Sequence, residues 1–220
     1  MRTGELVDHT KRHLLRDRAE PGLYTRSELL MYINEAESLF ARRTHCLFDY
    51  ESPLTVLDLV PGEARYRLDD RIVYVQYATH EDGVPLRDRT RSYTPAGKAE
   101  GRPVVYTLDT GVRSLRVYPT PEQEYTVHLG VARKPMRKMT LDESDRSPEI
   151  PEDYHLALCD WAAARALRNN DAEAAASERT VEEFILQWER AVREMKREVT
   201  HLRSGDTPRS VSTWTHKRTM

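Results

Sequence analysis

The feature that most constrains how this chain of 220 residues can fold is a change in hydrophobic period that occurs twice. Apolar side chains recur at helical spacing in the two terminal parts, but alternate as strands require across residues 54–135. Such segments form separate helical and sheet regions. We therefore predict an α+β protein in which a helical body, residues 1–50 and 148–203, is interrupted by an antiparallel β-rich domain, residues 51–147.

Two helices are expected in the N-terminal part. The first is a short amphipathic helix over residues 3–17. The second begins at a predicted capping box, in which the Thr25 hydroxyl accepts a backbone N–H and the Glu28 carboxylate reaches back to the cap. Apolar side chains then recur to about Arg43, so one face of this helix is expected to be buried.

Six runs of strand-forming residues follow, separated by turn dipeptides such as Pro61-Gly62. Alternation within them predicts sheets with one covered face, and hence a small antiparallel sandwich or a curled sheet. The runs are residues 54–60, 64–68, 71–78, 103–109, 113–119 and 125–135.

Residues 83–102, between the third and fourth runs, contain five basic and two acidic side chains and little to bury. This segment is either a surface loop or a long arm that leaves the sheet and contacts a neighbouring subunit or the tail, since long loops in compact domains are commonly functional. The residues assigned to the arm contact are Leu86, Arg87, Arg89, Arg91 and Tyr93.

A second charged junction lies between the strands and the last helices. Four basic residues within 133–138 are followed directly by acidic residues within 142–145. The block is interpreted either as a solvated linker or as a match for opposite charge on the next subunit.

Two helices are expected after this junction. Pro151 opens the first, where its missing N–H costs nothing, and the helix is apolar nearly all round. The second, about 172–203, would be roughly 45–50 Å long and carries apolar residues in a 4-3 repeat. The residues assigned to helical packing or to an interface are Tyr154, Leu158, Trp161, Ile185, Trp188, Val192 and Met195.

The apolar stripe of the last helix has three interpretations. It packs within one chain, lines a subunit interface in a ring, or forms a two-stranded coiled coil. β-Branched residues at a positions, Ile185, Val192 and Val199, favour the coiled coil, whereas Trp188 at a d position and the short length oppose it.

Recognisable catalytic chemistry is absent from the sequence. It contains no GxGxxG, P-loop, CxxC, HExxH or EF-hand pattern. His9 and His13 are four residues apart but have no third ligand nearby, and Cys46 and Cys159 are expected to be buried free thiols. We expect no enzyme activity, cofactor or metal. The net charge of −2 and the lack of a long apolar run indicate neither bulk nucleic-acid binding nor a membrane.

The order of four segments resembles the head–tail connector, or adaptor, proteins of tailed bacteriophages, of the tail-tubular-A-like kind. The first segment is the helix "LYTRSELLMYINEAESLFARRT", and the second is the start of the β part, "TVLDLVPGEARYRLDDRIVYVQYA". The third, "PEIPEDYHLALCDWAAARALRNND", is similar to the family's Ile-Pro-Glu-x-Tyr-His beginning of a buried helix. The fourth is the long closing helix with an extended polar tail.

The resemblance implies a homo-oligomeric ring, commonly of twelve subunits, in the virion neck beneath the portal, with host cytoplasm as the site of assembly. The helical part would form the ring body and the β part would face the tail or nozzle protein, with non-specific contact to genomic DNA in the channel. Residues 204–220 would be the portal-contacting tail, and the contacts assigned there are Arg209, Val211, Trp214, His216, Lys217 and Arg218.

Two other functions stay open at the level of sequence. One is a nucleic-acid-associated regulatory or packaging factor that dimerises through its C-terminal helix. Alternating Arg87, Arg89 and Arg91 could follow phosphates in an extended arm, although no DNA-reading motif surrounds them. The other is an enzyme with an uncharacterised site.

Overall fold

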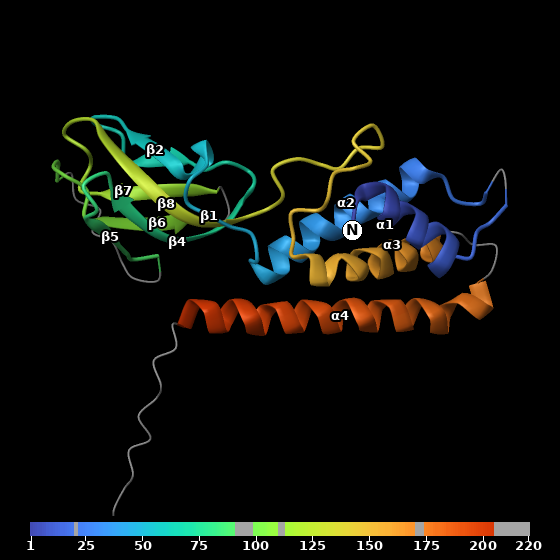
Figure 1. Cartoon of the computed structure of the whole chain (residues 1–220). Helices are drawn as coiled ribbons and strands as arrows, with labels where there is room; N and C mark the ends of the chain where they lie inside the picture. The colour runs from blue at the N-terminus through green and yellow to red at the C-terminus, as the bar shows by residue number, and fades with distance from the viewer. Residues whose placement is uncertain (20–21, 91–98, 110–112, 170–173, 205–220) are drawn as a thin grey trace, which may run out of the picture.

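The computed structural model describes residues 1–19, 22–90, 99–109, 113–169 and 174–204. The α+β class is confirmed, because a β domain lies at one end and a helical body at the other (Figure 1). The last helix runs along the helical body and continues beneath the β domain in this view.

Within the described residues, the helical body contains four α-helices: α1 (Thr3–His9), α2 (Arg26–Thr44), α3 (His155–Asn169) and α4 (Ala174–Ser204). A π-helical turn, Thr10–Leu14, continues α1, and a 3-10 turn, Glu152–Tyr154, precedes α3. The Thr25 hydroxyl accepts the Glu28 N–H at 3.2 Å, as predicted. The other half of the predicted capping box is wrong, because the Glu28 carboxylate accepts from the Tyr32 hydroxyl at 3.0 Å instead.

The sheet contains eight described strands in the order β1-β8-β4-β5-β6-β7-β3, and β2 also pairs with β8. All six predicted runs form strands. The prediction of an antiparallel sheet is wrong at one pairing, since β5 and β6 are parallel. The strands are β1 (Phe48–Asp49), β2 (Val56–Leu59), β3 (Arg65–Arg67), β4 (Ile72–His80), β5 (Pro85–Asp88), β6 (Val105–Asp109), β7 (Ser114–Tyr118) and β8 (Tyr125–Arg133).

Strand β5 lies within the segment predicted to be an arm. The prediction that the chain leaves the sheet there is wrong for residues 85–88, because the turn at Gly83 returns them to pair with β4. Leu86 is buried in the β core, and the Arg87 N–H donates to the Val104 carbonyl at 2.9 Å. A four-residue strand with one buried side chain is too short to give a visible alternation in sequence.

Each region has its own hydrophobic core. The helical core contains Leu6, Phe40, Leu158 and Trp188 among others, and the β core is built on inward-facing residues of the strands. Both cysteines are free thiols; Cys159 is buried as predicted, whereas Cys46 is half-buried just after α2. Burial raises the pKa of the Cys159 thiol to about 12, so it is protonated at neutral pH.

A charged cluster joins the two regions at the end of β8. Arg133 Nε donates to Asp49 Oδ2 and Arg133 Nη1 donates to Glu149 Oε2, both at 2.6 Å. The Glu149 N–H in turn donates to the buried Glu37 carboxylate of α2 at 2.6 Å. Burial raises the pKa of Glu37 to about 7, although backbone N–H groups partly offset this. Arg133 is therefore neither solvated nor available to another subunit, which corrects both interpretations of the second junction for this residue.

Candidate assembly surfaces

The apolar stripe of α4 is buried within the chain. Trp188 has no exposed area and its ring lies 5.4 Å from that of Phe40 and 5.1 Å from that of Trp161, between ring centroids. Val192 and Met195 are also buried in the helical core. The stripe therefore packs within one chain, and these side chains are not available to a coiled-coil partner.

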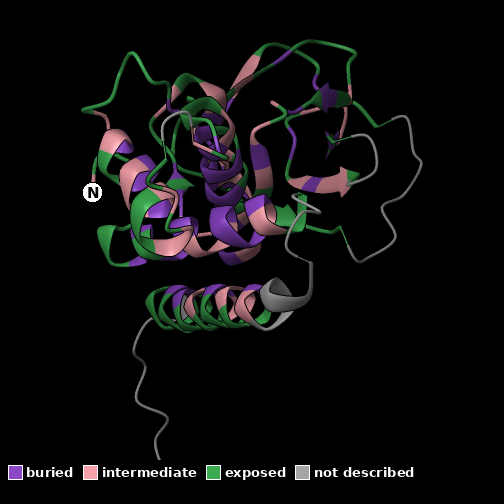
Figure 2. Cartoon of the chain, turned by 90° about the vertical axis from the view of Figure 1, so that its right-hand side faces the viewer, coloured by how far each residue is buried: buried purple, intermediate pink, exposed green. Residues whose placement is uncertain are grey.

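The opposite side of α4 is exposed over residues 182–202, where the side chains are described (Figure 2). Leu186 is 60% exposed there and lies one helical turn after the exposed Glu182 and Glu183. One turn and two turns further on, Arg190 and Arg193 are exposed. Glu194, next to Arg193, is exposed as well, so this side of α4 runs from acidic, through one leucine, to a mainly basic part.

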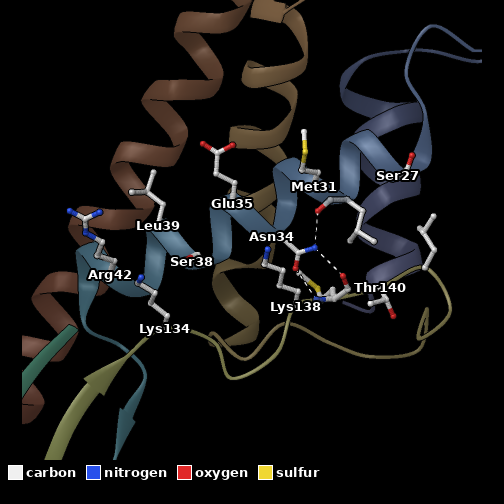
Figure 3. A pocket seen from close by; sticks show the side chains of 13 residues that line it. Ser27, Met31, Asn34, Glu35, Ser38, Leu39, Arg42, Lys134, Lys138 and Thr140 are labelled. Atoms are coloured by element: carbon white, nitrogen blue, oxygen red, sulfur yellow. Dashed lines mark hydrogen bonds between the residues drawn. The ribbon is translucent and has the colours of Figure 1, made fainter. Parts of the chain in front are cut away.

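A groove of about 730 Å³ lies along the side of α2 that faces away from α3 and α4 (Figure 3). Its inner surface includes the buried Leu30 and Met139. Asn34 fixes the far wall, since its side-chain amide donates to the Met139 carbonyl at 3.0 Å and its oxygen accepts the Met139 N–H at 2.8 Å. The groove is lined by Ser27, Leu30, Met31, Asn34, Glu35, Ser38, Leu39, Arg42, Lys134, Lys138, Met139, Thr140 and Leu141.

The outer face of the sheet carries a cluster of exposed aromatic residues, Phe48, Tyr50 and Tyr77, while the exposed Tyr74 stacks on His45 with ring centroids 5.8 Å apart. The Phe48 ring centroid is 6.1 Å from that of Tyr50 and 6.2 Å from that of Tyr77. Tyr77 is paired with Gly130 of β8, and a Cβ atom at residue 130 would lie 2.3 Å from the Tyr77 ring. The glycine therefore allows the tyrosine ring to lie flat across β8.

The structure does not bring the three predicted groups of contact residues together in the part of the chain that it describes. Leu86 is buried, whereas Arg87 and Arg89 are exposed on and just after β5. Arg91 and Tyr93, and the assigned tail residues Arg209, Val211, Trp214, His216, Lys217 and Arg218, lie outside the described residues. The assigned helical residues are in the core, apart from the half-buried Trp161 and Ile185.

No metal site is formed by the described residues, since no group of three or more His, Cys, Asp or Glu side chains could hold an ion there. The predicted pair His9 and His13 stacks with ring centroids 5.3 Å apart. Burial, and then the neighbouring His13, lower the pKa of His9, so a bound proton is disfavoured. Among the described helices, none combines the length and the apolar character needed to cross a bilayer.

The fold and these surfaces define an α+β protein whose described part exposes a groove beside α2, one side of α4 and aromatic side chains on the sheet. In the comparison with protein families, residues 1–212 match the family described as SU10 adaptor protein, and the chain belongs to that family. The predicted resemblance to phage head–tail adaptors is confirmed, and a structural role in the virion follows from it. No curated protein matches the chain.

Sequence reasoning missed both the groove and the aromatic face. A weak indication of the groove in the sequence is the helical spacing of Met31, Ser38 and Arg42, which places them on the side of α2 opposite its apolar face. The aromatic face has a signal in Gly130, because a glycine inside a strand indicates a close approach by another group. Register shifts in β4 between Ile72 and Tyr74 and between Val75 and Tyr77 conceal the alternation that would have revealed the tyrosines.

Proposed function

We propose that this protein is a head–tail adaptor of the phage neck, which forms a ring beneath the portal and provides the attachment site for the tail. Twelve copies are expected, from the resemblance to the connector proteins. The observation that carries the proposal is the family match over residues 1–212, because it spans the helical body, the β domain and α4 together.

The distribution of exposed and buried surface supports a ring over a dimer. A nucleic-acid-associated factor that dimerises through the last helix needs an apolar stripe on α4, but Trp188, Val192 and Met195 are already buried in their own chain. A closed ring needs two different surfaces on each subunit instead. The exposed side of α4 and the groove beside α2 are two such surfaces.

The tail, residues 204–220, is proposed to contact the portal, with Trp214 as its anchor. Aromatic residues in small pockets supply much of the binding free energy at interfaces, while flanking Ser and Thr can form hydrogen bonds. Flanking basic residues, Arg209, Lys217 and Arg218, add attraction to an acidic surface. The β domain is proposed to face the tail or nozzle protein.

Deletion of residues 204–220 tests this proposal. The last buried side chain that is described on α4 is Val199, so the described core stays intact in the shortened chain. We expect the thermal midpoint to stay unchanged while binding to the portal protein of the same virion, measured by co-sedimentation, is abolished. Trp214→Ala in the full chain should weaken the same binding by about tenfold or more. Portal binding that survives the deletion would contradict the tail assignment.

A further inference from the structure

The two ends of the groove beside α2 carry charges of opposite sign. Figure 3 shows Arg42 and Lys134 at one end and Ser27 and Thr140 at the other. Lys138 lines the middle of the groove, and none of these three cations forms an ion pair with a residue that the structure describes. The exposed Asp142 follows directly after the lining residues at the far end. Glu35 also lines the groove, but its carboxylate is paired with Arg165 of α3 at 3.6 Å. Apart from this paired group, the groove is basic at the C-terminal end of α2 and acidic just beyond its N-terminal end.

The exposed side of α4 has the complementary order of charges. Glu182 and Glu183 come first, Leu186 stands in the centre, and Arg190 and Arg193 follow. Leu186 is 60% exposed, which leaves a large apolar side chain in water between two charged groups of opposite sign. Such a side chain is stabilised if it enters an apolar recess.

The lengths of the two surfaces also correspond. Glu182 and Arg193 are eleven residues apart on a continuous helix, or about 16 Å along its axis. The groove extends along α2 from Ser27 to Arg42, or about 22 Å. A helix placed in it can therefore set its acidic turn against Arg42 and Lys134 and its basic turn near Asp142, with a leucine over the apolar floor.

These two surfaces lie on opposite sides of the helical body. The groove opens away from α3 and α4, and the exposed side of α4 faces away from the rest of the chain. One subunit cannot bring its own two surfaces together. A second copy can, and contacts between two different surfaces repeat from subunit to subunit until they close.

We infer that the α2 groove of one subunit binds the exposed side of α4 from the next, with Leu186 over Met139 and Glu182 beside Lys134 and Lys138. This contact rests on the proposed ring and specifies how its subunits meet. A nucleic-acid strand fits the groove less well, because the apolar floor and the acidic end do not match a continuous phosphate backbone.

Charge reversal on each surface separately tests the contact. Lys134→Glu with Lys138→Glu reverses the groove, and Glu182→Lys with Glu183→Lys reverses α4. We expect each reversed full-length chain to keep its thermal midpoint but to associate at least about tenfold more weakly than the unaltered chain, alone or on the portal, by mass photometry. A mixture of the two reversed chains should regain closed assemblies, because each reversed groove then meets a reversed helix.

Arg137→Glu is the matched control, since Arg137 is exposed, one residue from Lys138, and does not line the groove. It should assemble like the unaltered chain. Normal assembly by both reversed chains, or no recovery in their mixture, overturns the contact while the proposed ring stands. Failure of the unaltered chain to form a closed assembly even on the portal overturns the proposed ring and this contact together.

Discussion

The stripe on α4 and the outer face of the β-sheet are both rich in large apolar side chains, yet they are buried to very different extents. Trp188 of the stripe is 0% exposed, whereas Tyr74 and Tyr77 of the sheet are 42% and 39% exposed. The stripe is covered by α2 and α3 of its own chain; nothing in the described part covers the sheet face to that degree. Apolar residues therefore serve folding in one region and remain on the surface in the other.

The largest expected effect comes from truncating the buried stripe. Trp188→Ala removes a side chain that contacts Phe40 and Trp161, and should lower the free energy of unfolding by about 3–5 kcal/mol. Tyr77→Ala on the sheet face is the comparison and should cost less than about 1 kcal/mol. Urea unfolding followed by circular dichroism measures both values. Similar losses for the two variants would show that the contrast between the regions is wrong.

The next effect concerns the cluster that joins the two regions. Arg133→Met leaves Asp49 and Glu149 without their shared cation, and all three side chains are largely buried. We expect a loss of about 2–3 kcal/mol at pH 7, below the value for a fully buried pair because some water reaches the cluster. If the regions are held by this cluster, the variant should also gain a separate unfolding transition for the β domain. A single transition at the original midpoint would exclude this role.

The same cluster predicts that the free energy of unfolding decreases at acidic pH. Desolvation opposes the charged form of Asp49, but the Ser52 N–H and Arg133 outweigh it and lower the pKa of Asp49 to about 2. A lowered pKa in the folded state means that the stabilisation is present above the ordinary pKa of 3.8 and is lost as the pH falls from there toward 2. In Arg133→Met, the free energy of unfolding should decrease less between pH 5 and pH 2.5 than in the unaltered chain. Urea unfolding at these two pH values would measure the difference.

Features of the fold could be predicted from sequence when they depend on neighbouring residues, and could not when they depend on residues far apart in the chain. Helices and six strands were visible because their periodicity is local, and Thr25 marked the start of α2. The parallel pairing of β5 with β6 was not visible, because it depends on which strands meet after a connection that leaves no local pattern. The groove was also hidden, since it is formed by α2 and a linker about a hundred residues later. Surfaces of that kind are set by tertiary packing.

The smallest expected effect on stability comes from a substitution beside Tyr77 on the outer face of the sheet. Gly130→Ala places a Cβ where the Tyr77 ring now lies, so the ring must swing outward into water. Because the ring is already partly exposed, the loss in stability should be only about 1 kcal/mol. In the double variant Gly130→Ala with Tyr77→Ala the clash disappears, so the two losses should sum to more than the measured total. Strict additivity would mean that the glycine and the ring do not interact, and that the flat aromatic face is not held by this pair.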